Sequence, residues 1–182
     1  MSRTDARIRY TQGVLKQALL SFLQEKPINK ITVKEVCERA ELNRATFYAH
    51  YSDCFALLES IEEDLLEAFQ QSLKLVASFD VTALIEAIYT MIEQQQEACR
   101  VLIFQNVCPN VLRRMISLAR DKSIAYWKQH LHRVTEAELE MLYTHLSNGL
   151  MHVVVEGYEK YSREEVVRFV NRIVQCSLSQ FQ

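Results

Sequence analysis

Glycine and proline are scarce in this sequence, with three glycines and two prolines among 182 residues. An all-β protein needs these residues at many turns, and a doubly wound α/β protein needs glycine at phosphate loops and helix ends. Both fold classes are therefore disfavoured. Apolar residues make up 49% of the chain, which is enough to form a core without disulfides or a structural metal. These features predict an all-α fold.

The sequence also lacks any uncharged apolar stretch of 18 residues, and no apolar run directly follows its polar N-terminus. We therefore expect neither a membrane span nor secretion. No C-x-x-C pair is present, and the five cysteines are scattered at Cys37, Cys54, Cys99, Cys108 and Cys176. An odd number of scattered cysteines fits reduced thiols better than a disulfide framework. We expect a cytoplasmic protein that has no membrane partner and no cofactor.

The charge is divided unevenly along the chain. Residues 1–51 carry nine Lys and Arg against five Asp and Glu, whereas residues 52–182 carry 12 against 18. A basic N-terminal part on an acidic body indicates a module that binds a polyanion, joined to a second part with another role.

Three helices are predicted in the basic part. An apolar stripe from Val14 to Phe22 forms one helix face, and Pro27 ends that helix. Thr32 and Glu35 form a capping box that starts a second, two-turn helix. Asn43 then caps a third short helix, from Arg44 to about His50. Two short helices joined by a tight turn after a longer helix predict a helix-turn-helix.

The outer face of the third helix suits DNA. No Asp or Glu occurs from residue 42 to residue 52, and the side chains expected on this face are Arg44, Thr46, Tyr48, Ala49 and His50. A surface that meets phosphates excludes carboxylates, so this pattern predicts double-stranded DNA as a partner.

The stretch from Val14 to Ile61 resembles the DNA-binding domain of the TetR/AcrR family of bacterial transcription regulators. The sharpest match is the run from Asn43 to Tyr51 (NRATFYAHY), which is similar to the family's S-x-x-T-[LIF]-Y-x-[HY]-F recognition helix. The resemblance implies DNA contacts from the second and third helices, at Thr32, Asn43, Arg44, Ala45, Thr46, Tyr48, Ala49 and His50. We expect Arg44 to read sequence, because its guanidinium can bridge the O6 and N7 atoms of guanine.

The sequence departs from the family pattern at two positions. Glu41 stands in the turn where the family has glycine, so we expect the turn to differ slightly. Cys54 replaces the lysine that the family places as a phosphate contact. The N-terminal arginines (Arg3, Arg7 and Arg9) form either a compensating basic arm or a solvated disordered tail.

After the helix-turn-helix, helical periodicity continues with few breaks. A long helix from about 53 to 77 is expected to join a DNA-binding domain (1–52) to a regulatory and dimerisation domain (53–182), giving about nine helices in all. The last two helices, 136–159 and 163–180, carry apolar stripes. The resemblance implies a homodimer through them, with interface residues Leu139, Leu142, Tyr143, Leu146, Leu150, Val153, Val170, Ile173 and Val174. The alternative is that the stripes bury against the chain's own core.

The resemblance also implies a pocket for a small-molecule effector between residues 80 and 133. Candidate lining residues are Tyr89, Phe104, Tyr126, Trp127 and His130, although aromatic residues at helical spacing are more often plain core. We therefore predict a ligand-responsive transcription regulator that binds a palindromic operator as a homodimer. We expect it to repress transcription rather than activate it.

Four rival functions are compatible with parts of the sequence. The catalytic signatures of hydrolases, nucleotide-binding enzymes and zinc proteases are absent, so no catalytic residue is assigned. A metal or pH switch at His145, His152 and Glu156 is conceivable, because they share a helix stripe, but no metal is expected. A thiol-redox regulator would use Cys54, for which we expect positive groups nearby. A helical interaction protein that binds no DNA is the remaining alternative.

Overall fold

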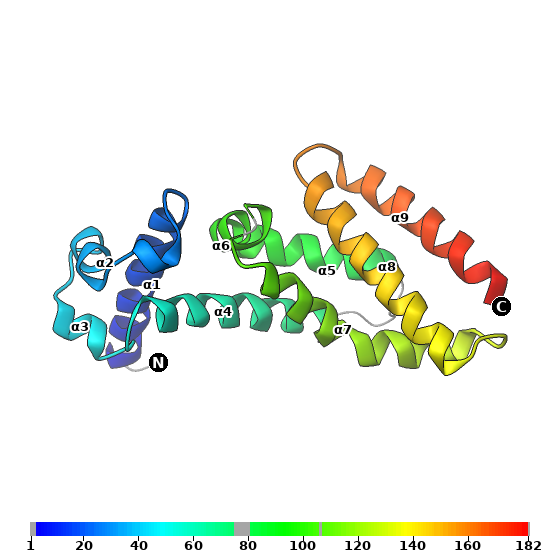
Figure 1. Ribbon diagram of the computed structural model, residues 1–182, viewed down its shortest axis with the longest axis horizontal. Coiled ribbons are helices and arrows are strands. Elements are labelled where there is room, and N and C mark those ends of the chain that lie inside the picture. The colour runs from blue at the N-terminus through cyan, green and yellow to red at the C-terminus, as the bar shows by residue number, and fades with distance from the viewer. Residues whose placement is uncertain (1–2, 75–80, 106, 182) are drawn as a thin grey trace. The chain divides into compact units, whose positions relative to one another are not determined.

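A computed structural model describes residues 3–74, 81–105 and 107–181 (Figure 1). All regular structure in these ranges is helical, as the composition predicts, and they contain no strand. Contacts within the chain divide it into two compact units. The first comprises the described parts of Met1–Leu65 and Glu97–Cys108, and the second those of Leu66–Gln96 and Pro109–Gln182. The functional boundary at residue 52 stays a prediction.

The first unit contains three helices that form the helix-turn-helix and a set of short helical segments. Its elements are α1 (Arg3–Leu23), the 3-10 turn η1 (Ile28–Lys30), α2 (Val33–Arg39), α3 (Arg44–Tyr48), the first part of α4 (Cys54–Lys74), α6 (Gln96–Cys99) and the π-helical segment η2 (Arg100–Phe104). The π-helical segment has no counterpart among the predicted elements. The polar tract at residues 93–97 contains the break between α5, which ends at Gln94, and α6, which begins at Gln96.

The core of the first unit explains why such short helices are stable. Leu19, Val36 and Phe47 come from α1, α2 and α3, and each is fully buried. Helices of five to seven residues do not persist alone in water. Burying each of these side chains contributes about 1.5–3 kcal/mol, so tertiary packing holds α2 and α3 in place.

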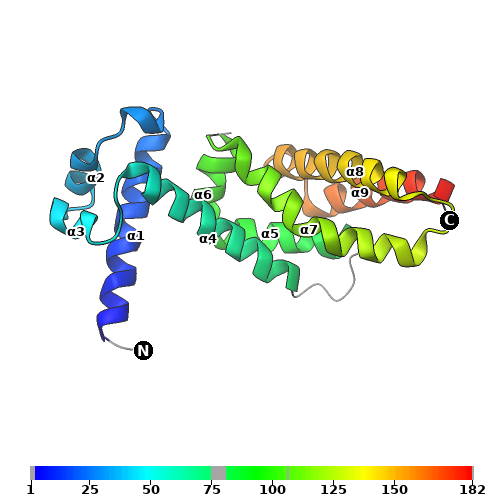
Figure 2. The same ribbon diagram turned by 60° about the horizontal axis from the view of Figure 1, so that its bottom comes forward.

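Helix α1 begins much earlier than its apolar stripe indicates. It starts at Arg3, and residues 5–10 are all exposed. Figure 2 shows these first turns extending past α2 and α3. The solvated disordered tail is therefore wrong for Arg7 and Arg9, which lie on a helix; the side chain of Arg3 lies outside the described residues. A helix nucleated by packing extends at little cost when no proline interrupts it.

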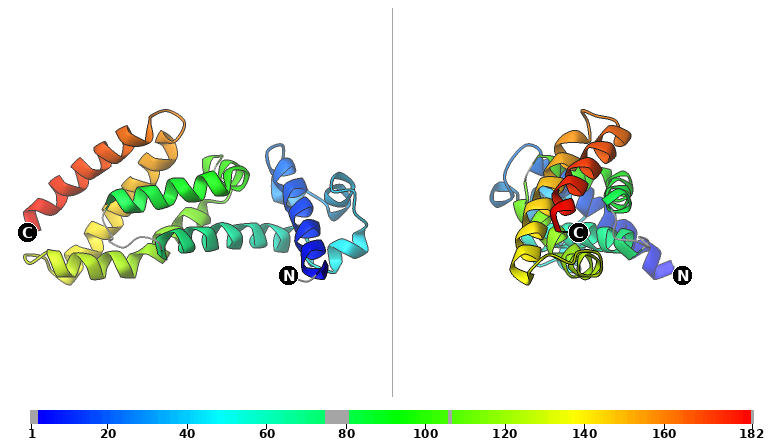
Figure 3. Two further views of the ribbon diagram at one scale, coloured as in Figure 1. Left: turned by 180° about the vertical axis from the view of Figure 1, so that it is seen from behind. Right: turned by 90° about the vertical axis from the view of Figure 1, so that its right-hand side faces the viewer.

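The second unit is built from four long helices. It contains the end of α4, α5 (Val81–Gln94), α7 (Pro109–His130), α8 (Glu136–Gly157), α9 (Arg163–Leu178) and the short η3 (Ser179–Phe181). Helices α8 and α9 form an antiparallel hairpin (Figures 1 and 3). Helix α9 also packs on α5, and α7 packs on α8.

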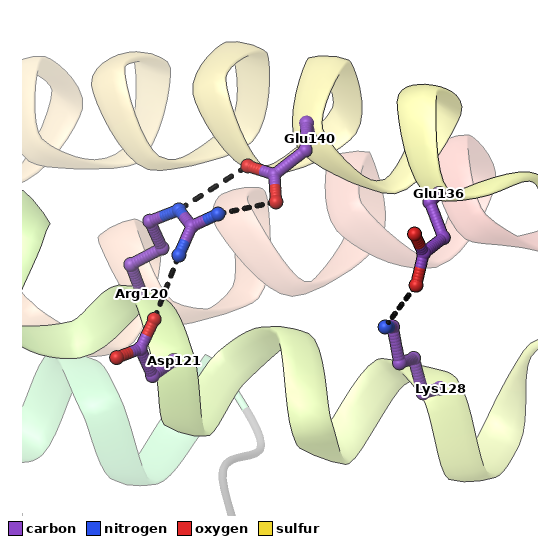
Figure 4. A network of polar contacts seen from close by, with 5 residues as sticks. All are labelled: Arg120, Asp121, Lys128, Glu136 and Glu140. Carbon is purple, nitrogen blue, oxygen red and sulfur yellow. Dashed lines mark hydrogen bonds and ion pairs between the residues drawn. The ribbon is translucent and has the colours of Figure 1, made fainter.

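Ion pairs join α7 to α8 along their exposed seam (Figure 4). The guanidinium of Arg120 donates to both carboxylate oxygens of Glu140 and also pairs with Asp121. Lys128 Nζ, in the last turn of α7, lies 2.7 Å from Glu136 Oε1 in the first turn of α8. Because these groups are exposed to solvent, each pair contributes little to the stability of the α7–α8 packing.

The α8–α9 turn requires close backbone packing at Gly157. A Cβ atom at this position would lie 3.2 Å from Val166 Cγ2 and 3.4 Å from Tyr161 Cδ2. Val166 is buried, so it has little freedom to move away. The absence of a side chain at Gly157 therefore lets the two helices meet at this end.

Several of the helices begin at the residues where capping side chains occur in the sequence. The capping box predicted at Thr32 and Glu35 has both reciprocal hydrogen bonds. The same arrangement starts α8 at Thr135 and Glu138 and α9 at Ser162 and Glu165. The predicted helix 53–77 is observed as Cys54–Lys74, and its remaining residues lie outside the described ranges. Within the part of the chain that is described, no helix has the length and apolar character needed to cross a bilayer.

Candidate functional sites

The start of α3 is fixed by one side chain. Asn43 Oδ1 accepts hydrogen bonds from the Thr46 backbone nitrogen at 2.7 Å and from the Thr46 hydroxyl at 2.9 Å. These bonds satisfy a helix-start donor that would otherwise be unpaired. Asn43 is exposed, but its carbonyl oxygen is already engaged in holding the helix.

The turn between α2 and α3 keeps a left-handed residue although glycine is absent. Glu41 has φ 53, its backbone N–H donates to Glu38 O, and Leu42 N–H donates to Cys37 O at 2.9 Å. This pair of bonds is the Schellman arrangement that commonly ends helices. The expectation that Glu41 changes the turn is therefore wrong: the backbone adopts the conformation despite the conformational cost of a side chain there.

The predicted DNA-reading face of α3 is open to solvent. Arg44, Ala45 and Ala49 are exposed, and the Tyr48 side chain is 57% exposed. Thr46 and His50 are half-buried. The opposite face is apolar: Phe47 is fully buried, and its ring meets that of Tyr48 edge-on with centroids 5.6 Å apart. This packing orients Tyr48 outward, beside Arg44.

Two hydroxyl groups of the predicted DNA set have partners within the protein. The Thr46 hydroxyl donates to Asn43, as described above, and the Thr32 hydroxyl donates to Glu35 Oε2 at 2.8 Å. A phosphate oxygen is only an acceptor, so it needs a donor that is not already in use. Contacts from these hydroxyls to phosphate would require the intramolecular bonds to break.

The N-terminus of α2 already carries an anion. The Glu35 carboxylate accepts from the Thr32 backbone N–H at 2.9 Å and lies 2.6 Å from Lys26 Nζ. The hydrogen bonds from Lys26 and Thr32 lower the pKa of Glu35 from 4.5 to about 2. Because a helix N-terminus attracts a negative group, a phosphate at this end of α2 would compete with the Glu35 carboxylate for the same donors. This geometry disfavours the predicted phosphate contact of Thr32.

Cys54 has none of the properties of a redox sensor. Its side chain is buried, and burial, with a smaller effect of Asp53, raises the pKa of its thiol to about 11. Reactive cysteines are exposed and have lowered pKa values. The thiol-redox alternative at Cys54 is therefore wrong: the thiol is buried, and the charged side chains that shift its pKa, Asp53 and Glu35, are acidic and raise it further.

The second unit contains a cavity of about 60 Å³ between its helices. Of the five predicted lining residues, only Trp127 lines it. The remaining walls are apolar side chains and three hydroxyl-bearing residues, Ser123, Tyr143 and Ser147. Sequence reasoning missed the two serines, although a small polar residue on an otherwise apolar helix face is a usable signal.

The other four predicted pocket residues lie elsewhere. Tyr89 is buried against Tyr158, with ring centroids 5.3 Å apart. Tyr126 and His130 face each other near the end of α7, with centroids 4.2 Å apart. Phe104 lies in η2, within the first unit. None of these four residues lines the cavity described above, because periodicity gives apolar positions without showing which of them enclose a void.

Most of the predicted dimer residues belong to the chain's own core. Five of them are buried in the single chain and so have little surface to offer a second copy: Leu139, Tyr143, Leu146, Val170 and Val174. Leu142, Leu150 and Val153 are half-buried, and the Ile173 side chain is 43% exposed. The structure also exposes large apolar side chains that the sequence analysis left out, at Met141, Tyr161 and Phe169.

The histidine stripe on α8 does not assemble a metal site. His152 Nδ1 lies 2.9 Å from Asn148 O, and Glu156 pairs with Lys160 at 3.0 Å. Among all residues whose placement is described, no three His, Cys, Asp or Glu side chains come together in a way that would hold a metal ion.

Comparisons with known proteins agree with this architecture. No family model matches the chain. The uncharacterized HTH-type transcriptional regulator YxbF of Bacillus subtilis (strain 168) is 37% identical over 62 residues, which is 34% of this chain and 16% of that protein. The chain thus matches only a small part of that relative's length.

Solved structures match over nearly the whole chain. A TetR transcriptional regulator from Streptococcus agalactiae 2603V superimposes with a TM-score of 0.68 and 22% identity, covering 94% of this chain and 97% of that one. The SmeT–triclosan complex gives 0.66 and 15% identity, with coverage of 92% and 90%. The chain therefore has the fold of the TetR-family transcriptional regulators, as the resemblance in its recognition-helix sequence predicts.

Proposed function

We propose that this protein is a transcription regulator that binds a specific double-stranded DNA sequence through α3. The observation that carries the proposal is the face of α3 on which Arg44 and Tyr48 are exposed, in a stretch (residues 42–52) that contains no Asp or Glu. The match to an HTH-type regulator supports the same function. A helix presented in this way fits the major groove.

Arg44 is the residue we assign to sequence readout. Its side chain is exposed at the first position of α3, where the helix is held by the Asn43 cap. Asn43 and Thr46 have their oxygen atoms engaged with each other, so the guanidinium is the best-placed donor at this end of the helix. A guanine contact by arginine is worth about 1–3 kcal/mol of discrimination.

We further propose that the protein acts as a homodimer on a palindromic operator. Phe169 and Ile173 are one helical turn apart on α9, and both remain largely exposed. An exposed apolar pair on one helix face favours association with another surface. Two-fold symmetry would place two copies of α3 about 34–36 Å apart, which matches successive major grooves.

A ligand-responsive repressor is the form of regulation we propose. The cavity in the second unit offers a binding site separate from α3, and the name of the structurally similar SmeT complex records a bound small molecule, triclosan. An effector would have to bind the DNA-free state more tightly than the DNA-bound state, since otherwise it shifts no equilibrium.

Selection of bound duplexes from a random pool, followed by gel shifts at several salt concentrations, tests the DNA-binding proposal. We expect a palindromic consensus and an affinity that falls steeply with salt. Arg44→Ala should weaken binding by about 1–3 kcal/mol and relax preference at one base position. Arg133→Ala is the matched control, because Arg133 is an exposed arginine of the second unit. Failure to enrich any sequence would refute the proposal.

The dimer is tested separately by light scattering. Ile173→Asp should shift the mass towards that of one chain, 21.3 kDa, whereas Leu118→Asp, at another exposed apolar position, should leave the mass unchanged. A single-chain mass for the unsubstituted protein at micromolar concentration would contradict the dimer.

A further inference from the structure

The walls of the cavity in the second unit carry no charged side chain. Its lining residues include no Asp, Glu, Lys, Arg or His, and burial raises the pKa of Tyr143 to about 12, so this phenol is neutral at ordinary pH. An ion entering the cavity would lose its hydration without meeting an opposite charge. The chemistry of the walls therefore excludes anions and cations as ligands.

Two of the three hydroxyl groups at the cavity already donate hydrogen bonds within the protein. Tyr143 donates to Ile116 O at 2.5 Å, and Ser147 donates to Tyr143 O at 2.6 Å. Their donor capacity is used by the backbone, so neither is the natural donor for a ligand.

The third hydroxyl is different. Ser123 is only 4% exposed and lines the cavity, and its hydroxyl forms no hydrogen bond with a side chain or carbonyl among the residues that the structure describes. Unlike the hydroxyls of Tyr51 and Tyr89, which are fully buried without a partner in the same described ranges, the Ser123 hydroxyl is reachable from the cavity. A ligand with one polar atom facing Ser123 can therefore use this hydroxyl, which both donates and accepts.

The volume limits the size of the ligand. The cavity measures about 60 Å³, which is less than the engineered cavity of about 150 Å³ known to hold benzene. Two methionines, Met115 and Met151, form part of the wall. Methionine side chains change conformation easily, so a ligand of benzene size can enter when they move, whereas a much larger rigid ligand cannot.

We infer that this cavity binds a compact, neutral, largely apolar molecule with one hydroxyl or carbonyl group, which hydrogen-bonds to Ser123. The inference deepens the proposed function, since it names the chemical class of the effector, and its regulatory meaning rests on that function. Binding itself does not depend on DNA.

Phenol, toluene and benzoate serve as probes, because they share a ring and differ in polar group and charge. Trp127 is the single tryptophan of the chain and lines the cavity, so its fluorescence reports occupancy directly. We expect phenol to bind, toluene to bind more weakly, and benzoate to leave the fluorescence unchanged. Binding of benzoate as tight as that of phenol, or no response to phenol, would overturn the inference.

Two variants separate a specific site from general apolar adsorption. Ser123→Ala should weaken phenol binding about tenfold and leave toluene binding unchanged. Ala119→Leu fills the cavity from the same helix and should abolish both responses, with thermal unfolding confirming that the variant is folded. Equal phenol affinity in Ser123→Ala and in the unsubstituted protein would contradict the assigned hydrogen bond.

Operator gel shifts with and without phenol distinguish the two proposals. If the protein selects no DNA sequence but phenol binds as described, the proposed function fails and the ligand site stands. If the operator is bound but phenol gives no fluorescence response, the ligand inference fails and the DNA-binding function stands.

Discussion

The backbone N–H of Leu42 donates to the carbonyl oxygen of Cys37 at 2.9 Å, and this bond closes α2 around Glu41 in a left-handed conformation. A side chain at such a φ costs about 1–2 kcal/mol, because Cβ crowds the following carbonyl oxygen. The turn sets the direction in which α3 leaves α2. The protein thus keeps the helix-turn-helix geometry at the expense of local strain.

Glu41→Gly should raise the free energy of unfolding by about 0.5–1 kcal/mol. Glycine removes the Cβ crowding, and its greater freedom in the unfolded chain offsets part of the gain. Urea unfolding measures the change. Glu41→Ala is the control, because it removes the carboxylate and keeps the crowding; equal stability of the two variants would show that the turn is not strained.

Stability should fall in acid because of Glu35. Its pKa is about 2 in the folded protein against an ordinary value of 4.5, so its contribution is present above about pH 4.5 and is lost as the pH falls towards 2. Glu35→Gln keeps a side chain that can complete the capping box and loses the charge. In urea unfolding between these pH values, the variant should show a shallower decline.

The decline should not disappear in Glu35→Gln. Hydrogen bonds from the Thr135 and Ser162 backbones lower the pKa of Glu138 and Glu165 in the same direction, so these two capping boxes continue to titrate. An unchanged pH dependence in Glu35→Gln would mean that Glu35 does not titrate as described.

Arg163 should stabilise the second unit through three contacts with α5. Its guanidinium lies 2.9 Å from Glu86 Oε2, pairs with Glu93, and lies 4.7 Å from the centroid of the Tyr89 ring. Because the side chain is about one-third exposed, we expect Arg163→Ala to cost about 1–2 kcal/mol.

Arg163→Lys tests whether geometry or charge matters. Lysine has no planar fork to pair with two carboxylates and lie over a ring, so it should recover less than half of the loss in urea unfolding. Full recovery by lysine would assign the effect to charge alone.

Thiol labelling should follow burial. Cys176 is exposed, whereas Cys54 and Cys99 are buried with pKa values raised to about 11 and 12 by desolvation. A thiol reagent at neutral pH should therefore modify Cys176 first.

Local signals were the most predictive part of the sequence. Thr32 and Glu35 lie three residues apart and can only complete each other's hydrogen bonds at a helix start, and the structure has both bonds. The same holds for Asn43 at the start of α3. These interactions form within one turn of chain, so they need no knowledge of the tertiary fold.

The contacts between helices far apart in the chain could not be predicted from the sequence in the same way. The apolar stripe containing Leu139 and Leu146 shows that one face of α8 is buried, but a stripe has the same pattern whether the chain itself or a second copy covers it. Likewise, Trp127 lines the cavity and Tyr126 does not, although they are neighbours in sequence. Which side chain meets a void depends on how helices far apart in sequence pack.

Gly157 and Val166 meet so closely across the α8–α9 turn that a methyl group at 157 would require Val166 to move by a few tenths of an ångström. During evolutionary divergence, the two positions are therefore expected to covary. We expect alanine at 157 to occur with a smaller residue at 166, and valine at 166 to occur with glycine at 157.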